Sequence, residues 1–370
     1  MRCSYMITIS VPGSILLLGE YSILEPDMRG LSMAVEPRLT LTAERSQTWT
    51  IIAKGCNEPA CFMLENISRE SVPVVKQTSG FSWANTALLQ IVIEQFIKIE
   101  SKNPFVNSGP YVITIDSSNL FHENKKLGLG SSAGVVIVFS AFLFLLAQLG
   151  KLTKEQLLDF CIPTHKFVQN GRGSGYDILT SIEGGLLFFS MSSYHYAEKI
   201  MLDAFDAEIW CAMNEVKTAS AINSYECYKN KHPLLTKIFW NKTQNLVNDA
   251  YRIIASMQQQ SGSTHKLTRE QIHYHKLVAV LRKAGRVNVR FGSAIGVSAQ
   301  FPIQSKSIMK SLGAGNEMAL SVPHYLLDNM DESYDRLDAE QPSVFTRTYS
   351  TNSLYVFPCK PTRGIVWEYV

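Results

Sequence analysis

Residues 125–150 read KKLGLGSSAGVVIVFSAFLFLLAQLG. This stretch opens as a glycine-serine turn and continues as a nearly unbroken apolar run over residues 135–147. A helix that crosses a membrane needs about 20 apolar residues, whereas runs of about 10 to 14 are typical of buried helices. Ser140 interrupts the run, and Lys151 follows its end. The stretch therefore predicts a buried helix rather than a membrane span.

The size and composition of the chain indicate a two-domain globular protein. Its 370 residues exceed one ordinary hydrophobic core, and 46% of them are hydrophobic against 18% charged. The net charge of +3, from 35 basic and 32 acidic residues, does not indicate nucleic acid as a partner. Seven cysteines without a Cys-x-x-Cys pair, and a start that lacks the features of a secretory signal, favour reduced thiols in the cytoplasm.

Hydrophobic periodicity predicts strands and helices that are mixed without strict alternation. Strands are expected at residues 7–24 on either side of a Pro12-Gly13 turn, then at 31–54, 111–117, 184–190, 207–213, 316–322 and 352–358. Helices are expected within residues 81–99, 133–149, 151–170, 233–258, 269–284 and 304–312. This order favours an α+β fold over a doubly wound sheet. We place the domains at residues 1–198 and 199–370.

The glycine-serine turn stands directly before the buried helix. A helix start leaves about four backbone N–H groups without intrahelical partners and carries a partial positive charge, which suits a phosphate group. Small residues allow close approach, and the serine hydroxyls can cap the helix or reach a metal. The turn is neither a Walker loop nor a full dinucleotide fingerprint. From these residues alone, a phosphate-binding loop and an ordinary serine-capped helix both stay open.

Four segments in order resemble the motifs of the GHMP kinases, which include galactokinases, homoserine kinases, mevalonate kinases and phosphomevalonate kinases. These segments are PGSILLLGEYSIL at residues 12–24, GLGSSAG at 128–134, GRGSGYDILTSIEGG at 171–185 and KSLGAGNEMAL at 310–320. The Gly-Ser-Gly-Tyr-Asp form after THKFVQN, the sequence KKLGLGSSAG, and VKTAS at 216–220 are similar to the phosphomevalonate kinase subfamily.

The resemblance implies a role for each matching residue. Asp177 would be the catalytic proton acceptor, although it can also be a turn aspartate that caps a helix. Ser132 would bind Mg²⁺. ATP would be bound by Lys126, Gly128, Gly130, Ser131, Ser132, Ala133 and Gly134. The substrate would be bound by Ser14, Glu20, Tyr21, Ser174, Gly175, Lys217, Ser220, Gly313, Ala314 and Gly315. Glu20 can equally be a buried structural acid.

Three positions depart from the family pattern. Ser14 stands where many members have a lysine in the first motif. Lys166 stands eleven residues before Asp177, where mevalonate kinases have a magnesium-binding glutamate. The third motif, which begins at Gly313, lacks the further glycines and the aspartate of the usual phosphomevalonate kinase form. Lys166 argues against a mevalonate kinase. The three departures together leave the identity of the acceptor and the rate of turnover open.

The resemblance implies two α+β domains with the active site in the cleft between them. It also implies a cytoplasmic phosphotransferase that uses ATP and Mg²⁺, and whose acceptor in isoprenoid synthesis is 5-phosphomevalonate. The expected partners are ATP and a small phosphorylated or hydroxylated metabolite, without nucleic acid or membrane, and the oligomeric state stays open. The alternatives are another GHMP kinase, acting on mevalonate or a sugar, or a non-catalytic regulator that binds a nucleotide or metabolite on the same fold.

Overall fold

The structure is a computed structural model that describes residues 6–56, 58–80, 86–122, 125–147, 151–200, 207–211, 218–258, 266–297, 308–312, 318–321 and 355–369. The chain divides into two compact units. Unit 1 comprises Met1–Ser14, Ala34–Gly185 and Thr362–Val370, and unit 2 comprises Ile15–Met33 and Leu186–Pro361. Both units are therefore discontinuous in sequence. The expected ranges 1–198 and 199–370 stay a prediction about the domains.

Unit 1 contains a mixed sheet whose strands alternate between buried and less buried residues. Its strands are β1 (Ile7–Leu18) and β2 (Arg29–Arg45), which both continue into unit 2, and β3 (Thr50–Lys54), β4 (Ala60–Glu65), β5 (Val74–Ser79), β6 (Tyr111–Asp116) and β15 (Val366–Tyr369). Strand β2 pairs antiparallel with β6, β6 pairs parallel with β3, and β3, β4 and β5 follow antiparallel. The alternation predicted at Leu39, Leu41 and Ala43 is confirmed, because all three are fully buried.

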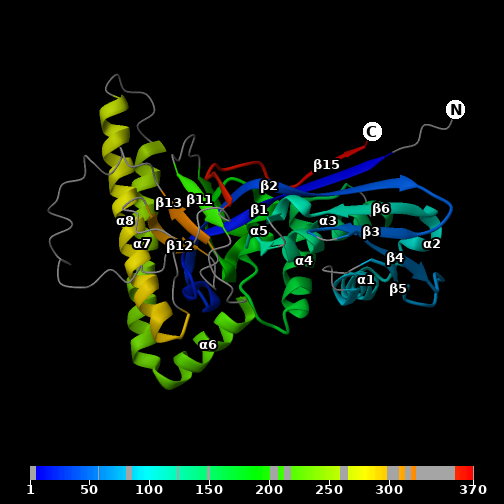
Figure 1. Cartoon of the computed structure of the whole chain (residues 1–370), viewed down its shortest axis with the longest axis horizontal. Helices are drawn as coiled ribbons and strands as arrows, with labels where there is room; N and C mark the ends of the chain where they lie inside the picture. The colour runs from blue at the N-terminus through cyan, green and yellow to red at the C-terminus, as the bar shows by residue number, and fades with distance from the viewer. Residues whose placement is uncertain are drawn as a thin grey trace. The chain divides into compact units, whose positions relative to one another are not determined.

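Five helices of unit 1 gather beside these strands (Figure 1). They are α1 (Thr86–Glu100), α2 (Phe105–Ser108), α3 (Ser131–Ala147), α4 (Lys154–Val168) and α5 (Tyr176–Glu183). Helix α3 is buried along nearly all its length, as the apolar run predicts, and it packs against α1, α4 and α5. Among the helices that the structure describes, α3 included, none combines the length and the hydropathy that a membrane crossing requires.

Unit 2 combines antiparallel strands with three longer helices. Strand β9 (Leu186–Ser190) pairs with β10 (Glu198–Ile200) on one side and with residues 29–33 of β2 on the other. A second sheet has the order β12 (Ile308–Leu312), β13 (Met318–Ser321), β11 (Glu208–Cys211) and β14 (Tyr355–Pro358). The helices of unit 2 are α6 (Thr218–Lys231), α7 (Pro233–Gln258) and α8 (Lys266–Ala294).

Helices α7 and α8 lie side by side (Figure 1). Phe239, near the start of α7, stacks on Phe291, near the end of α8, with ring centroids 3.7 Å apart, so the two helices run antiparallel. These rings belong to the hydrophobic core of unit 2. The predicted bounds of α7 are confirmed, whereas α8 is longer than the predicted 269–284.

Short elements complete the described chain. The 3-10 helices are η1 (Ser22–Leu24), η2 (Ser118–Leu120) and η3 (Met191–Tyr196). The small strands β7 (Phe121–His122) and β8 (Lys125–Lys126) pair with each other just before the glycine-serine turn.

Two predicted elements are wrong. Residues 7–18 form one strand that passes through Pro12 and Gly13 without a turn. Strand β1 pairs with β15 only at residues 7–10, so Pro12 lies past that ladder, and a Cβ at Gly13 would lie 3.0 Å from the Cβ of Leu129. Gly13 thus allows a close approach rather than a chain reversal. Of the helix predicted at 304–312, the described residues 308–312 form strand β12, because pairing with β13 overrides the local pattern.

Candidate functional site

Three of the resembling segments meet within unit 1. The backbone N–H of Ser14, from the first motif, donates to the carbonyl oxygen of Leu129 at 3.2 Å. A Cβ placed on Gly130 would lie 2.9 Å from Ser14 Oγ and 3.6 Å from the Cβ of Asp177. The first motif, the glycine-serine turn and the segment that carries Asp177 therefore converge at Gly130. Glycine, which has no side chain, fits at position 130 between Ser14 and Asp177 without displacing either.

The shape of the glycine-serine turn depends on two of its glycines. Gly128 and Gly130 have φ angles of +82° and +77°, in the left-handed region that favours glycine. The carbonyl oxygen of Gly130 accepts the first helical hydrogen bond of α3, from Gly134 N at 2.9 Å. The N–H groups of Ser131, Ser132 and Ala133 have no acceptor within the helix, because no helical carbonyl lies four residues before them. They are therefore available to a ligand at this end of the helix. The helix start is thus suited to an anion.

The four small residues at the start of α3 differ in exposure. Ser131, Ala133 and Gly134 are buried, and Ser132 is half-buried. A Cβ on Gly134 would lie 3.1 Å from the side chain of Leu39 on β2, so this glycine packs the helix against the sheet. Lys126 is exposed on β8, close before the turn in sequence.

Asp177 lies in the first turn of α5. The turn before it contains Gly173 and Gly175, with φ angles of +93° and +81°, and Ser174, whose Oγ accepts from Tyr176 N at 3.4 Å. The carboxylate oxygen Oδ1 accepts from Ile178 N at 3.0 Å. The side chain of Asp177 is 19% exposed, so a ligand can reach a carboxylate that the protein otherwise holds in place.

His165 is a neighbour of Asp177 that the sequence did not single out. It lies near the end of α4, is 2% exposed, and places Nδ1 at 3.7 Å from Asp177 Oδ1. The available signal was its place in THKFVQN, the segment just before the glycine-rich turn. One histidine among eight gives no periodic pattern that marks it.

Glu20, a predicted substrate residue, forms a buried ion pair in unit 2. Its Oε1 accepts from Nζ of Lys310 on β12, and the same Nζ donates to the carbonyl oxygen of Leu17 at 2.6 Å. The two side chains are 5% and 0% exposed. Burial lowers the pKa of Lys310, and the charge of Glu20 opposes that shift. Sequence reasoning missed Lys310, although it is the first residue of the segment at 310–320 that resembles a family motif.

Tyr21 and Ser220 are the other described substrate candidates of unit 2. Tyr21 is 8% exposed and stacks on Tyr225 of α6, with ring centroids 5.4 Å apart, so it is part of the core. The hydroxyl of Tyr225 donates to Glu25 at 2.7 Å, and Nζ of Lys229 donates to the same carboxylate at 2.6 Å. These contacts fix α6, whose first turn carries the exposed Ser220. Lys217, Gly313, Ala314 and Gly315 lie outside the described residues.

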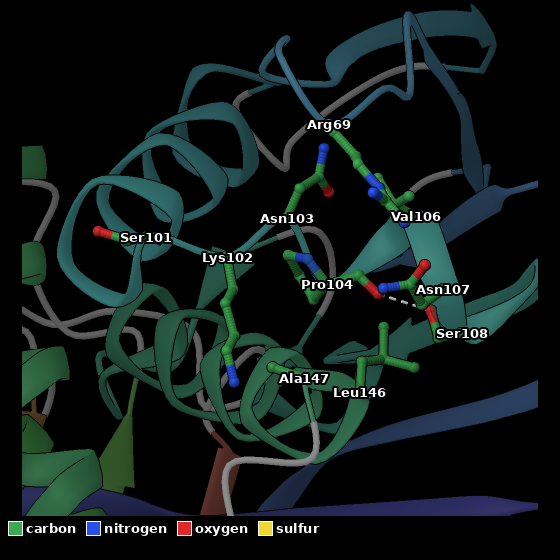
Figure 2. A pocket seen from close by; sticks show the side chains of 10 residues that line it. All are labelled: Arg69, Ser101, Lys102, Asn103, Pro104, Val106, Asn107, Ser108, Leu146 and Ala147. Carbon is green, nitrogen blue, oxygen red and sulfur yellow. Dashed lines mark hydrogen bonds between the residues drawn. The ribbon is translucent and has the colours of Figure 1, made fainter.

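A pocket of about 420 Å³ lies elsewhere in unit 1, beside α2 and the end of α3 (Figure 2). Arg69 and Lys102, both exposed, extend along its sides. The amide nitrogen of Asn103 donates to the carbonyl oxygens of Ser68 and Ser71 at 2.8 and 3.1 Å, so this side chain ties loops together. The described residues predicted for ATP, metal or substrate do not line this pocket.

The comparisons with known proteins agree with the fold. No family model matches the chain. The chain is 23% identical over 226 residues to a phosphomevalonate kinase of Saccharolobus solfataricus, a match that covers 60% of this chain and 62% of that protein. It is similar in structure to the mevalonate kinase of Methanococcus jannaschii, with a TM-score of 0.59, 16% identity, and coverage of 98% and 100% of the two chains. It is also similar to a Streptococcus pneumoniae phosphomevalonate kinase solved in complex with phosphomevalonate and AMPPNP, with a TM-score of 0.58, 14% identity, and coverage of 96% and 99%.

These structural neighbours are GHMP kinases, and the chain has their mixed α and β fold. The predicted fold class is confirmed. The kinases with this fold act on different acceptors, so the fold does not select one among them.

Proposed function

We propose that the protein is an ATP-dependent kinase of the GHMP type that transfers the γ-phosphoryl group of ATP to 5-phosphomevalonate. The observation that carries the proposal is the convergence of Ser14, Gly130 and Asp177 in unit 1. It brings an accessible carboxylate to the start of α3, where an anion is favoured. Phosphoryl transfer depends mainly on positioning and on charge stabilisation, and this arrangement would contribute to both.

The nucleotide phosphates would lie at the start of α3. Backbone N–H groups of Gly130, Ser131 and Ala133 would hold them, with Lys126 supplying positive charge. The N–H of Gly134, predicted to bind ATP, instead donates to the carbonyl oxygen of Gly130, so this residue would contribute only by its small size. Mg²⁺ takes hard oxygen ligands and keeps several waters, and the half-buried hydroxyl of Ser132 fits that donor set. When bound, Mg²⁺ would neutralise charge on the phosphates.

Asp177 would accept the proton of the attacking acceptor oxygen. An oxygen of the acceptor's phosphate forms a bond to the γ-phosphorus, the bond from that phosphorus to the β,γ-bridging oxygen breaks, and ADP leaves. Among the described residues, both contacts of the Asp177 carboxylate use Oδ1. Oδ2 is therefore the oxygen that can take the proton and orient the acceptor.

Three features support phosphomevalonate as the acceptor. The curated relative from Saccharolobus solfataricus is a phosphomevalonate kinase. The Gly-Ser-Gly-Tyr-Asp form and VKTAS are similar to that subfamily, and Lys166 replaces the metal-binding glutamate of mevalonate kinases. Lys217 and Ser220 would bind the acceptor's phosphate and hydroxyl groups. A phosphate monoester needs such cations, because charge-assisted hydrogen bonds are the strong ones.

A regulator that binds a nucleotide without catalysis is the second candidate. Ser14 favours it, because a lysine is absent from that position of the first motif. The accessible carboxylate of Asp177 beside Gly130 opposes it, since a binding protein has no need of a proton acceptor there.

The decisive experiment is a coupled ADP-release assay with phosphomevalonate, mevalonate, galactose and homoserine as acceptors. We expect the highest kcat/KM with phosphomevalonate. A higher kcat/KM with mevalonate or galactose would support the kinase activity and identify that compound as the acceptor in place of phosphomevalonate. ATP binding without ADP release on any acceptor would favour the regulator.

Lys217→Ala tests the acceptor's charge within the same assay. We expect a higher KM for phosphomevalonate and a nearly unchanged KM for ATP, because truncation leaves the acceptor's phosphate without a charged partner. Lys231→Ala, an exposed lysine at the end of α6, is the matched control. If Lys217→Ala raised the KM for ATP alone, Lys217 would be assigned to nucleotide binding instead.

Ser132→Ala tests the metal. We expect it to raise the Mg²⁺ concentration needed for half-maximal activity, with little change in the unfolding temperature. Ser131→Ala, at the neighbouring buried serine, is the control and should leave the Mg²⁺ response unchanged. An equal Mg²⁺ response in all three proteins would leave Ser132 a helix-capping role only.

A further inference from the structure

His165 lies between Asp177 and Gln169. Its Nδ1 is 3.7 Å from Asp177 Oδ1, and its Nε2 is 3.3 Å from the side-chain nitrogen of Gln169. The ring is 2% exposed, so protein groups rather than water decide its orientation. The distance to Asp177 exceeds that of a direct hydrogen bond, so the contact in this structure is electrostatic.

Gln169 is itself held by the turn that leads to Asp177. It caps the end of α4, where its backbone N–H donates to the carbonyl oxygen of His165 at 3.0 Å. A Cβ on Gly173 would lie only 2.1 Å from Gln169 Oε1, so the bare backbone of Gly173 is what admits this amide. The backbone N–H of Arg172 donates to the carbonyl oxygen of Gln169 at 3.2 Å. The glycine-rich turn therefore fixes Gln169, and Gln169 fixes the imidazole.

The amide of Gln169 selects the tautomer of the imidazole. When its nitrogen donates to Nε2, that ring nitrogen is the acceptor, and the proton of the neutral ring is on Nδ1. Nδ1–H then faces Oδ1 of Asp177. An N–H directed at one carboxylate oxygen restrains the rotation of the carboxyl group and leaves the other oxygen for a ligand.

The elements packed around Asp177 offer few other charges. Helix α3, which contacts α5, contains no charged residue. On α4, Lys154 pairs at 3.1 Å with Glu183 at the opposite end of α5. Among the described residues, His165 is the basic side chain recorded within ion-pair distance of Asp177. Removing it therefore takes away an interaction that these two helices do not replace.

We infer that His165 is a positioning residue for the proposed reaction: through Nδ1–H it holds the Asp177 carboxylate with Oδ2 directed to the acceptor. The inference rests on the proposed function. It assigns His165 no contact with the substrate and no transfer of a proton. If this role is correct, removing the Nδ1 donor lowers turnover but leaves the affinity for the nucleotide unchanged.

A pair of amide variants separates this role from a role in packing. The amide nitrogen of asparagine lies two bonds from Cβ, as Nδ1 does, whereas that of glutamine lies three bonds away, as Nε2 does. We expect His165→Asn to retain most of the parent kcat. His165→Gln and His165→Ala should lose about tenfold to a hundredfold, the scale of a misplaced reacting group, with KM for ATP unchanged.

Two further variants serve different purposes: one is a control for folding, and the other tests the contact between Gln169 and His165. Thr164→Val alters the neighbouring buried residue of α4 and should leave kcat unchanged. Gln169→Leu removes the amide that holds Nε2 and should lower kcat while His165 is still present. Thermal unfolding of each variant shows whether it is folded at the assay temperature.

The outcomes distinguish this inference from the proposed function. Equal kcat in His165→Asn and His165→Gln, or a parent-like kcat in His165→Ala, would overturn the positioning role and leave the kinase intact. A raised KM for ATP with unchanged kcat would also overturn it. A parent protein that releases no ADP with any acceptor would overturn the proposed function itself, and the role with it.

Discussion

Among the described residues, the pair Asp177–His165 and the pair Glu20–Lys310 differ in how much of each is open to solvent. In unit 1, the Asp177 side chain is 19% exposed beside a fully buried imidazole. In unit 2, both Glu20 and Lys310 are closed off, and the pair is tied to the carbonyl oxygen of Leu17. A carboxylate with one accessible oxygen can meet a ligand, whereas a closed ion pair cannot part without leaving a buried charge. On this comparison we propose a catalytic role for the first pair and a structural role for the second.

The largest expected effect concerns the closed pair. Lys310→Met should lower the free energy of unfolding by about 3–5 kcal/mol, because it leaves the carboxylate of Glu20 buried without its partner. Chemical denaturation measures this loss. Lys76→Met, which removes an exposed ion pair with Glu65, is the control and should cost at most about 1 kcal/mol.

The double variant Glu20→Leu with Lys310→Met sharpens this result. Replacing both partners by apolar side chains removes the unpaired charge, so most of the stability should return. A double variant as unstable as Lys310→Met would show that the lysine stabilises unit 2 through another contact, such as the one with Leu17.

The open pair should respond in turnover rather than in stability. Asp177→Asn keeps the shape of the side chain and removes its capacity to accept a proton. We expect kcat to fall by about a hundredfold or more, which corresponds to about 2.7 kcal/mol in the barrier. The Kd for ATP and the unfolding temperature should stay close to those of the parent. Unchanged turnover would remove Asp177 from the chemistry.

Gly130→Ala should disturb the open pair through the backbone. An alanine at a φ of +77° costs about 1–3 kcal/mol, and its Cβ would meet Ser14 Oγ at 2.9 Å. Gly171 has the same φ of +77° and open space around a Cβ, so Gly171→Ala is a matched control for the strain alone. Both variants should lose stability, and Gly130→Ala alone should also lose kcat. Equal kcat values in Gly130→Ala and Gly171→Ala would show that Gly130 has no specific role in the site.

Ser14→Ala should have the smallest effect. Its Oγ is fully buried and has no hydrogen-bond partner among the described residues. Removing an unsatisfied hydroxyl should leave the free energy of unfolding unchanged or higher. If the hydroxyl donates to a bound phosphate, kcat/KM falls by a factor equivalent to about 0.5–1.5 kcal/mol. An unchanged kcat/KM would leave Ser14 without a role in binding.

The sequence predicted the elements whose information is local. Helix α3 follows from an apolar run too short for a membrane and long enough for a buried helix, and α7 from its helical periodicity. The glycine-serine turn was predicted from its small residues directly before the apolar run, and in the structure Gly128 and Gly130 have left-handed φ angles. These signals lie within a few residues of the structures that they specify.

The errors and omissions depend on contacts between distant segments. Strand β12 was predicted as part of a helix. It is a strand because it pairs with β13, and in the sequence Lys310 looks like a residue on the polar face of a helix. The partner of Lys310 is Glu20, 290 residues away in the sequence. His165 acquires its meaning only when α4 and α5 pack together. No local pattern encodes either pairing.

The most direct measurement follows labelled γ-phosphoryl transfer from ATP to phosphomevalonate in a single turnover. It compares the parent, Asp177→Asn, and the double variant Glu20→Leu with Lys310→Met. Rapid transfer by the parent and the double variant, with transfer by Asp177→Asn at least about a hundredfold slower, is the predicted result. A parent that transfers nothing, or a folded double variant as slow as Asp177→Asn, would contradict the assignment of chemistry to unit 1 and of cohesion to the buried pair of unit 2.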